Sequence, residues 1–206
     1  MLRAPAILLM ISCSILLAQE AEFAYMGVNN CKMCHNKKDK GAQFDIWSDG
    51  PHAKVFETLK SEEALKIATG LKLEGPPHEA GECLVCHTTG WGKADGYEVL
   101  SAEFIANPEN ARAVKKNDYK ANVGCENCHG AGSGYKSKKT MEGIFSGEID
   151  PATVGLIYPN KEVCLTCHNE KNPNFQEEFD FDAMVAKITH PYPEEFKATK
   201  GTSPGK

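Results

Sequence analysis

Val123-Gly-Cys-Glu-Asn-Cys-His-Gly-Ala-Gly-Ser133 carries the pattern Cys-x-x-Cys-His at its centre. The same five-residue pattern occurs three more times in the chain. A Cys-x-x-Cys-His run is the signature of c-type haem attachment. The two thiols bond the vinyl groups of one porphyrin, and the adjacent imidazole ligates the iron from the proximal side. The sequence therefore predicts four covalently bound haem c groups, with iron as the metal.

The four motifs account for eight of the nine cysteines, and the ninth, Cys13, lies near the start of the chain. The predicted attachment residues are Cys31, Cys34, Cys83, Cys86, Cys125, Cys128, Cys164 and Cys167, and the proximal iron ligands are His35, His87, His129 and His168. A zinc ribbon, a redox dithiol or a structural disulfide also uses Cys-x-x-Cys pairs. None of these alternatives requires a histidine directly after the second cysteine, so haem attachment is the favoured interpretation.

Residues Met1–Ala18 are typical of a secretory signal peptide, with Arg3 ahead of a mostly apolar run and cleavage expected near residues 18–21. Met10-Ile-Ser-Cys13 is a weaker match to a lipoprotein signal. Export agrees with the motifs, because c-type attachment in bacteria takes place outside the cytoplasm. We expect a periplasmic or extracellular protein without a transmembrane segment in the mature chain. Residues 19–196 form the predicted tetrahaem domain, and residues 197–206 form a polar tail predicted to be disordered.

The composition is acidic, with 28 Asp and Glu against 23 Lys and Arg and a formal net charge of −5. Haem propionates would add further negative charge. An acidic surface favours docking to a basic patch on a redox partner protein and disfavours binding to nucleic acid.

Seven histidines are available for the four predicted irons. After the four proximal ligands, His52, His78 and His190 remain, and we predict each as a distal iron ligand. His52 precedes a predicted helix that ends near Gly70, and His78 lies in a Pro-Pro turn. His190 ends a helix predicted after Asp180, with Pro191 stopping it.

Three irons can then have two histidine ligands, and one cannot be completed from this chain's histidines. That iron could be open, could bind a methionine, or could take a ligand from a neighbouring subunit. The methionines of the expected mature chain are Met26, Met33, Met141 and Met184. Met33 lies inside a haem motif and Met184 on an apolar helical face, so both are interpreted as packing residues. Met26 and Met141 stay open as candidates.

The chain resembles the cytochrome c554 family of tetrahaem cytochromes over most of its expected mature length. The resemblance rests on the order of the motifs and on several flanking segments. These are Trp47 followed by His52-Ala-Lys, Gly90-Trp-Gly and Gly96-Tyr after the second motif, Gly124–Gly132, and Phe181-Asp-Ala-Met-Val ending at His190.

The resemblance implies a mainly α fold with many loops, its core built around four stacked haems. It implies bis-histidine ligation at three haems and a five-coordinate second haem, held by His87. It would pair His52 with His129, and His190 with His168. The family's remaining distal histidine falls after the third motif, where this chain has Tyr135-Lys-Ser-Lys-Lys. His78 is the substitute, on the haem of His35 or on another.

These observations predict a carrier of single electrons between redox partner proteins, through closely spaced haems of low potential. Two alternatives remain. An open haem could make the protein an enzyme acting on nitric oxide, hydroxylamine or a peroxide. A ligand supplied by a neighbouring copy could make it the protomer of an extracellular cytochrome filament.

Overall fold

The computed structural model describes residues 23–175 and 180–190; the predicted signal peptide and polar tail lie outside these residues. The described residues form short helices joined by turns and loops, with one isolated antiparallel bridge, between Thr88 and Ala121, and no strand. The α-helices are α1 (Val28–His35), α2 (Gln43–Asp49), α3 (Val55–Thr58), α4 (Glu62–Gly70), α5 (Gly81–His87), α6 (Ala102–Ala106), α7 (Ala111–Asp118), α8 (Cys125–His129), α9 (Lys138–Ser146), α10 (Lys161–Leu165) and α11 (Phe181–Ile188). Short 3-10 helices are η1 (Lys38–Lys40), η2 (Pro51–Lys54), η3 (Pro108–Asn110) and η4 (Pro151–Val154). The expected mainly α fold with many loops is confirmed.

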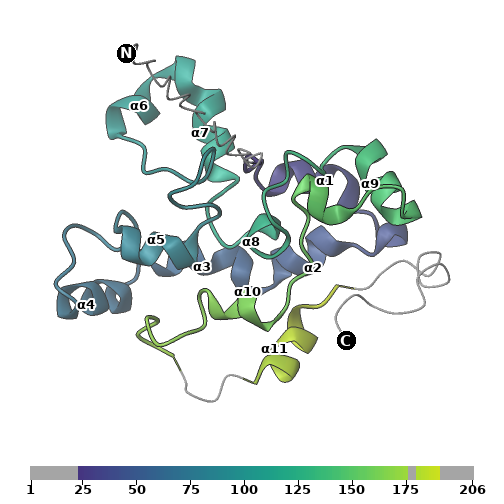
Figure 1. Cartoon of the computed structure of the whole chain (residues 1–206). Coiled ribbons are helices and arrows are strands. Elements are labelled where there is room, and N and C mark those ends of the chain that lie inside the picture. Colours follow the sequence, from purple (N-terminus) through teal and green to yellow (C-terminus); the bar gives the residue numbers. More distant parts are fainter. Residues whose placement is uncertain (1–22, 176–179, 191–206) are drawn as a thin grey trace, which may run out of the picture.

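Helix α8 lies near the middle of the molecule, with α4 and α5 to one side and α1 and α9 to the other (Figure 1). The longest helices, α4 and α9, have nine residues each. Isolated helices of this length are marginal in water. Their stability must therefore come from contacts between elements.

The segment before α8 makes several of these contacts through its backbone. The backbone N–H of Val28, at the start of α1, donates to the carbonyl oxygen of Tyr119 at 3.0 Å. The indole N–H of Trp47 in α2 donates to the carbonyl oxygen of Val123 at 2.8 Å. Gly27 has φ +77°, and a Cβ there would lie 2.9 Å from the Cβ of Tyr119. Only glycine allows this approach of α1.

Glu126, inside the third haem motif, is 3% exposed and binds the residues that lead into α1. Its carboxylate accepts backbone N–H groups from Met26 at 2.8 Å, Gly27 at 2.7 Å and Gly132 at 2.7 Å. Hydrogen bonds to an ionised acceptor are stronger than neutral ones, and they offset the desolvation of the buried charge. Glu126 thus joins the first motif's helix to the third motif.

Asn127, the next residue, joins the third motif to the second in the same way. Its side chain accepts from the backbone N–H of Gly124 at 2.9 Å and from the hydroxyl of Thr89 at 2.8 Å, and it donates to the carbonyl of Thr88 at 3.0 Å. Thr88 and Thr89 directly follow His87 and are fully buried. The second and third motifs are therefore held in a fixed register.

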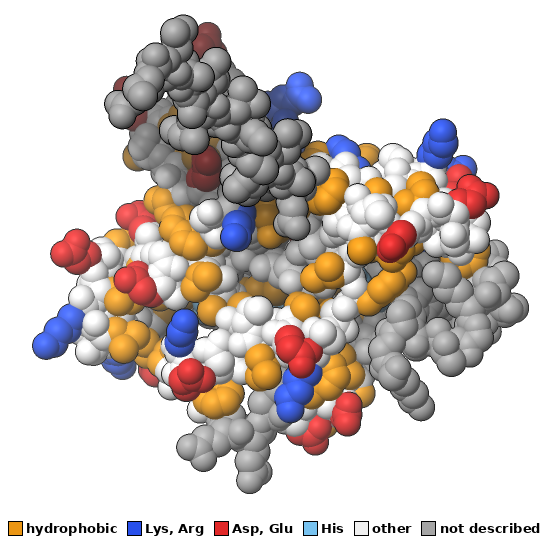
Figure 2. Space-filling model, in the orientation of Figure 1, with side chains coloured by type: hydrophobic (Ala, Val, Ile, Leu, Met, Phe, Trp, Pro, Cys, Tyr) orange, Lys and Arg blue, Asp and Glu red, His pale blue; other side chains and the backbone are white. Residues whose placement is uncertain are grey.

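Apolar packing among the described residues is divided between two small clusters. One contains Phe56, Leu59 and Leu84, and the other contains Tyr135, Ile144 and Leu156. Hydrophobic side chains are spread over the visible surface (Figure 2), and exposed examples include Met33, Val85 and Ile105. A protein interior this small agrees with the expectation that porphyrins would form much of the core.

Several sequence predictions of local structure are confirmed. Asp180 caps α11 by accepting the N–H of Ala183 at 3.0 Å, and the helix ends just before His190. The helix predicted after His52 is in two parts, because α3 ends before Leu59 and Ser61 caps α4 anew. The predicted end near Gly70 is confirmed, because Gly70 is the last residue of α4 and Leu71 follows as its cap.

Helix α9 was not predicted. Ser137 starts it, accepting the N–H of Thr140 at 3.0 Å, and Gly147, with φ +81°, ends it. The serine cap and the glycine at the end were the available signals of a helix. The polar and apolar residues between them show no clear helical periodicity.

Replacing Glu126 tests its role in the fold. Glu126→Ala would leave three buried or partly buried backbone N–H groups without their acceptor, so we expect the free energy of unfolding to fall by at least about 3 kcal/mol. Denaturant unfolding of the intact protein measures this change. Glu142→Ala is the control, because Glu142 is exposed and pairs only with Lys138 at 3.5 Å. The free energy of unfolding of the control should stay within about 0.5 kcal/mol of the wild-type value. A change equally small in Glu126→Ala would show that Glu126 does not stabilise the fold.

Candidate haem-binding sites

Each Cys-x-x-Cys-His motif lies on or directly after a short helix. Helices α1, α5 and α8 end at the proximal histidines His35, His87 and His129. In the fourth motif, α10 ends at Leu165, and the following turn continues as the N–H of His168 donates to the carbonyl of Cys164 at 2.9 Å. All four motifs therefore place their thiols and imidazole on a helical turn.

Three of the proximal imidazoles have an acceptor at Nδ1. The acceptors are the amide oxygen of Gln43 for His35 (3.3 Å), the carbonyl of Val55 for His87 (2.7 Å) and the carbonyl of Ile157 for His129 (3.2 Å). A histidine that donates from Nδ1 keeps Nε2 as the ligating nitrogen, and the hydrogen bond raises its basicity. The donor set thus fits a haem iron. These acceptors were not found from the sequence, because two are backbone carbonyls and Gln43 carries no motif.

Two histidine pairs face one another. The ring centroids of His52 and His168 are 6.2 Å apart, and those of His129 and His190 are 6.0 Å apart. Two imidazoles bound to one metal through bonds of about 2 Å have centroids about 6 Å apart once the ring radii are added. Both spacings therefore fit one iron between two rings. The family resemblance implies a different pairing, His52 with His129 and His190 with His168; the structure instead places His52 beside His168 and His190 beside His129.

Burial lowers the pKa of His52, His129 and His190 and so favours their neutral form. Burial, followed by the neighbouring His129 and His35, lowers the pKa of His190 to about 4. Burial and the neighbouring His168 lower the pKa of His52. A metal binds the neutral imidazole, so these rings need lose no proton at neutral pH before they ligate.

The thiols show which motifs are neighbours. Cys31 and Cys125 lie close enough that the neighbouring Cys125 thiol raises the pKa of Cys31, and the Cys167 thiol likewise raises the pKa of Cys86. The first motif is therefore beside the third, and the second is beside the fourth. Burial and the nearby Cys164 and Cys167 raise the pKa of Cys128 to about 11, so the third and fourth motifs are also adjacent.

His78 lies in the turn between α4 and α5, five residues before Cys83. Its Nδ1 is buried without a hydrogen-bond partner, and its Nε2 is 3.9 Å from the Glu79 carboxylate. The connection between α4 and α5 lies on the opposite side of the molecule from α1 (Figure 1). The suggestion that His78 serves the haem of His35 stays a prediction, and this location of the turn favours a haem nearer to α5.

The four methionine candidates differ in their surroundings. Met33 is 68% exposed and Met184 is 43% exposed, so the described protein chain itself buries neither, and their interpretation as packing residues stays a prediction. Met26 lies against Gly132, with its Cγ 3.6 Å from where a Cβ of Gly132 would be. Met141 packs against the cluster of Tyr135, Ile144 and Leu156. Both remaining candidates are thus near the loop that follows the third motif.

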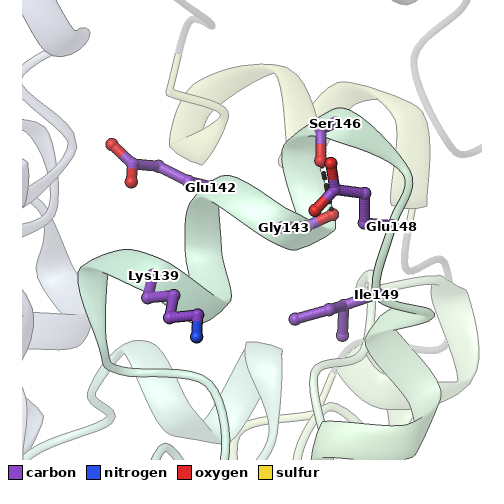
Figure 3. A pocket seen from close by; sticks show the side chains of 6 residues that line it. All are labelled: Lys139, Glu142, Gly143, Ser146, Glu148 and Ile149. Atoms are coloured by element: carbon purple, nitrogen blue, oxygen red, sulfur yellow. Dashed lines mark hydrogen bonds between the residues drawn. The ribbon is translucent and has the colours of Figure 1, made fainter.

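Residues 23–175 and 180–190 contain no group of three or more His, Cys, Asp or Glu side chains placed to hold a metal ion. A surface pocket beside α9 is lined by Lys139, Glu142, Gly143, Ser146, Glu148 and Ile149 (Figure 3). It contains no thiol or imidazole and does not belong to the haem sites. In the described part of the chain, no helix is long and apolar enough to cross a membrane.

Comparisons with known proteins identify a matching family and a similar fold. Residues 30–130 match the family described as cytochrome c554 and c-prime. Cytochrome c-554 of Nitrosomonas europaea is 27% identical over 157 residues, which cover 72% of this chain and 59% of that protein. The chain thus spans less than two thirds of this relative. A solved structure of reduced cytochrome c554 from Nitrosomonas europaea is similar in fold, with a TM-score of 0.56 and 24% identity, covering 90% of this chain and 99% of that one.

Gln43 allows a test of the hydrogen bond to His35. Gln43→Leu removes the acceptor, so the ligand becomes less basic and the reduction potential of one haem should rise, by up to about 59 mV for a tenfold change in relative affinity for the two iron states. Gln43→Glu is the matched variant, because a charged acceptor should lower the same potential. Spectroelectrochemical titration measures both, and shifts of the same sign in the two variants would contradict the assignment.

Proposed function

Because the chain belongs to the cytochrome c554 family, and is accordingly a multihaem c-type cytochrome with covalently bound haem c, we propose that it is an exported tetrahaem carrier of single electrons. Residues 19–196 form the carrier domain, and redox partner proteins outside the cytoplasm are its donor and acceptor. Attachment is through the eight motif cysteines. Ligation is by the four proximal histidines together with His52, His78 and His190.

The adjacency of the motifs is the observation that carries this proposal. Cys31 contacts Cys125, Cys128 is near Cys164, and Cys167 contacts Cys86. These cysteines link the motifs in the order first, third, fourth, second, and Asn127 also links the third motif directly to the residues that follow the second. Bound haem would supply one reversible one-electron iron couple at each motif. A connected set of redox sites suits a protein that accepts an electron at one surface and releases it at another.

The histidines suit electron transfer rather than substrate chemistry at the paired sites. His52 with His168 and His129 with His190 would fill both axial positions of their irons, leaving no place for a substrate. Ligation by two histidines omits the axial methionine that raises the potential, so low potentials follow. Hydrogen bonds at Nδ1 hold the proximal rings in one orientation in both oxidation states.

A second candidate function is favoured by the histidine count. All seven histidines are among the described residues, and they can complete only three of four irons. The remaining iron could bind nitric oxide, hydroxylamine or a peroxide while the other sites supply electrons. Nothing in the described residues supports a filament, and we do not propose one.

Haem quantitation tests the proposed cofactor content. The purified mature protein should contain four covalently bound haems, seen as a haem-to-protein ratio of about four and as a matching gain in mass under denaturing conditions. Cys164→Ser with Cys167→Ser should reduce the ratio to about three. Bound zinc, or disulfides in place of haem, would contradict the proposal.

Salt dependence tests docking to a redox partner. The acidic chain should be attracted to a basic patch on its partner, so the bimolecular electron-transfer rate should fall several-fold between about 10 mM and 200 mM salt as the charges are screened. Stopped-flow kinetics with a basic and an acidic redox protein measures this effect. The acidic protein is the control, and its rate should rise with salt. Equal, salt-independent rates would contradict electrostatic docking.

A further inference from the structure

The identity of the iron without a second histidine can be argued from the structure, given the proposed function and its four haems. His52 lies beside His168, and His190 lies beside His129, whose effect on the pKa of His190 is larger than that of His35, so we assign these four histidines as two pairs. His35, His87 and His78 remain for the other two irons. His35 and His87 are the proximal ligands of separate motifs, so the position of His78 decides which iron is completed.

His78 belongs with the second motif. The turn that carries it runs directly into α5: the N–H of Cys83 and the N–H of Leu84 both donate to the carbonyl of Ala80, at 3.0 and 2.9 Å. A buried ring nitrogen without a hydrogen-bond partner, as at Nδ1 of His78, is costly unless something binds it. The connection between α4 and α5 lies on the other side of the molecule from α1 (Figure 1), so we assign His78 to the iron of His87 and not to that of His35.

The loop after the third motif borders the first motif instead. Ser133 and Ala24 exchange two hydrogen bonds, from Ala24 N–H to the Ser133 hydroxyl at 2.8 Å and from Ser133 N–H to the Ala24 carbonyl at 3.1 Å. Glu126 holds Met26 and Gly132 by one carboxylate oxygen. This loop therefore runs beside the residues that lead into α1, and it brings Tyr135 close to the thiols of Cys31 and Cys125.

We propose that the iron held by His35, and not the iron held by His87, is the one that lacks a second histidine, and that Tyr135 lies at its free position. The site takes a small neutral ligand such as carbon monoxide or nitric oxide. His78 completes the iron of His87. The family resemblance placed the open iron at the second motif; the histidine positions of this chain move it to the first.

The surroundings of Tyr135 explain why the iron stays open and why a neutral ligand suits it. The phenol is 8% exposed, and its hydroxyl donates to the carbonyl of Gly130 at 2.6 Å. Burial and the nearby Glu126 raise the pKa of Tyr135, so it stays protonated and does not bind iron as a tyrosinate. Ile144 and Leu156 pack around the ring, and an anion would lose hydration in such surroundings.

Spin state and carbon monoxide binding of the dilute holoprotein test this assignment. The oxidised protein should give a high-spin ferric EPR signal from about one iron in four, and the reduced protein should bind about one carbon monoxide per chain. Tyr135→His should abolish both, because the new imidazole completes the iron. Tyr135→Phe should keep both. His78→Ala should double the high-spin fraction. Lys66→His, on the exposed face of α4, adds a histidine elsewhere and should change nothing.

Three results would overturn the inference. A high-spin signal that survives unchanged in Tyr135→His, with the haem count intact, would place the open iron elsewhere. A wild-type protein with low-spin iron alone would mean that Met26, Met141 or another residue supplies the ligand. An EPR spectrum of Tyr135→Phe that differs from that of the wild type would mean that the phenolate of Tyr135 is itself the iron ligand. A haem count below four in the wild type would instead refute the proposed function. The effect of Tyr135→His on the spin state of the iron at the first motif could still be measured in that case.

Discussion

The buried carboxylate of Glu126 is the interaction on which the arrangement of the motifs depends. It accepts three backbone N–H groups, two from the residues that lead into α1 and one from the loop after the third motif. Its neighbour Asn127 binds the residues that follow the second motif. These are the two residues between Cys125 and Cys128. In this chain the variable positions of the third attachment sequence are therefore also the junction of three motifs, and a cofactor site and a folding contact occupy the same turn.

This junction matters because little else holds the chain together. The helices are short, and the two apolar clusters lie on either side of α8, one around Leu84 and one around Ile144. Neither is large enough to act as the single interior of a domain of this length. Buried polar contacts and the covalent cofactors must therefore supply much of the stability that a hydrophobic core gives other domains. The fold and the cofactor sites are accordingly one structure, and loss of either should weaken the other.

Much of this could be predicted from the sequence, since the chemistry is local. The spacing of Cys31–His35 and its three counterparts predicts attachment without knowledge of the fold, and Asp180 predicts the start of α11. The distal pairing is different, because His52 and His168 are far apart in the chain and meet only through tertiary contacts. The family resemblance implies other partners than those that the structure places close together. Glu126 and Tyr135 were also missed as structural residues, because a single buried polar group has no periodic signal.

The positions of the irons test the central claim most directly. Anomalous scattering at the iron edge, from a crystal of the holoprotein, locates each iron against the surrounding histidines. We expect one iron between His52 and His168 and one between His129 and His190, with the four irons in the spatial order of first, third, fourth and second motif. An iron shared by His52 and His129, or a different order of the motifs, would contradict the account.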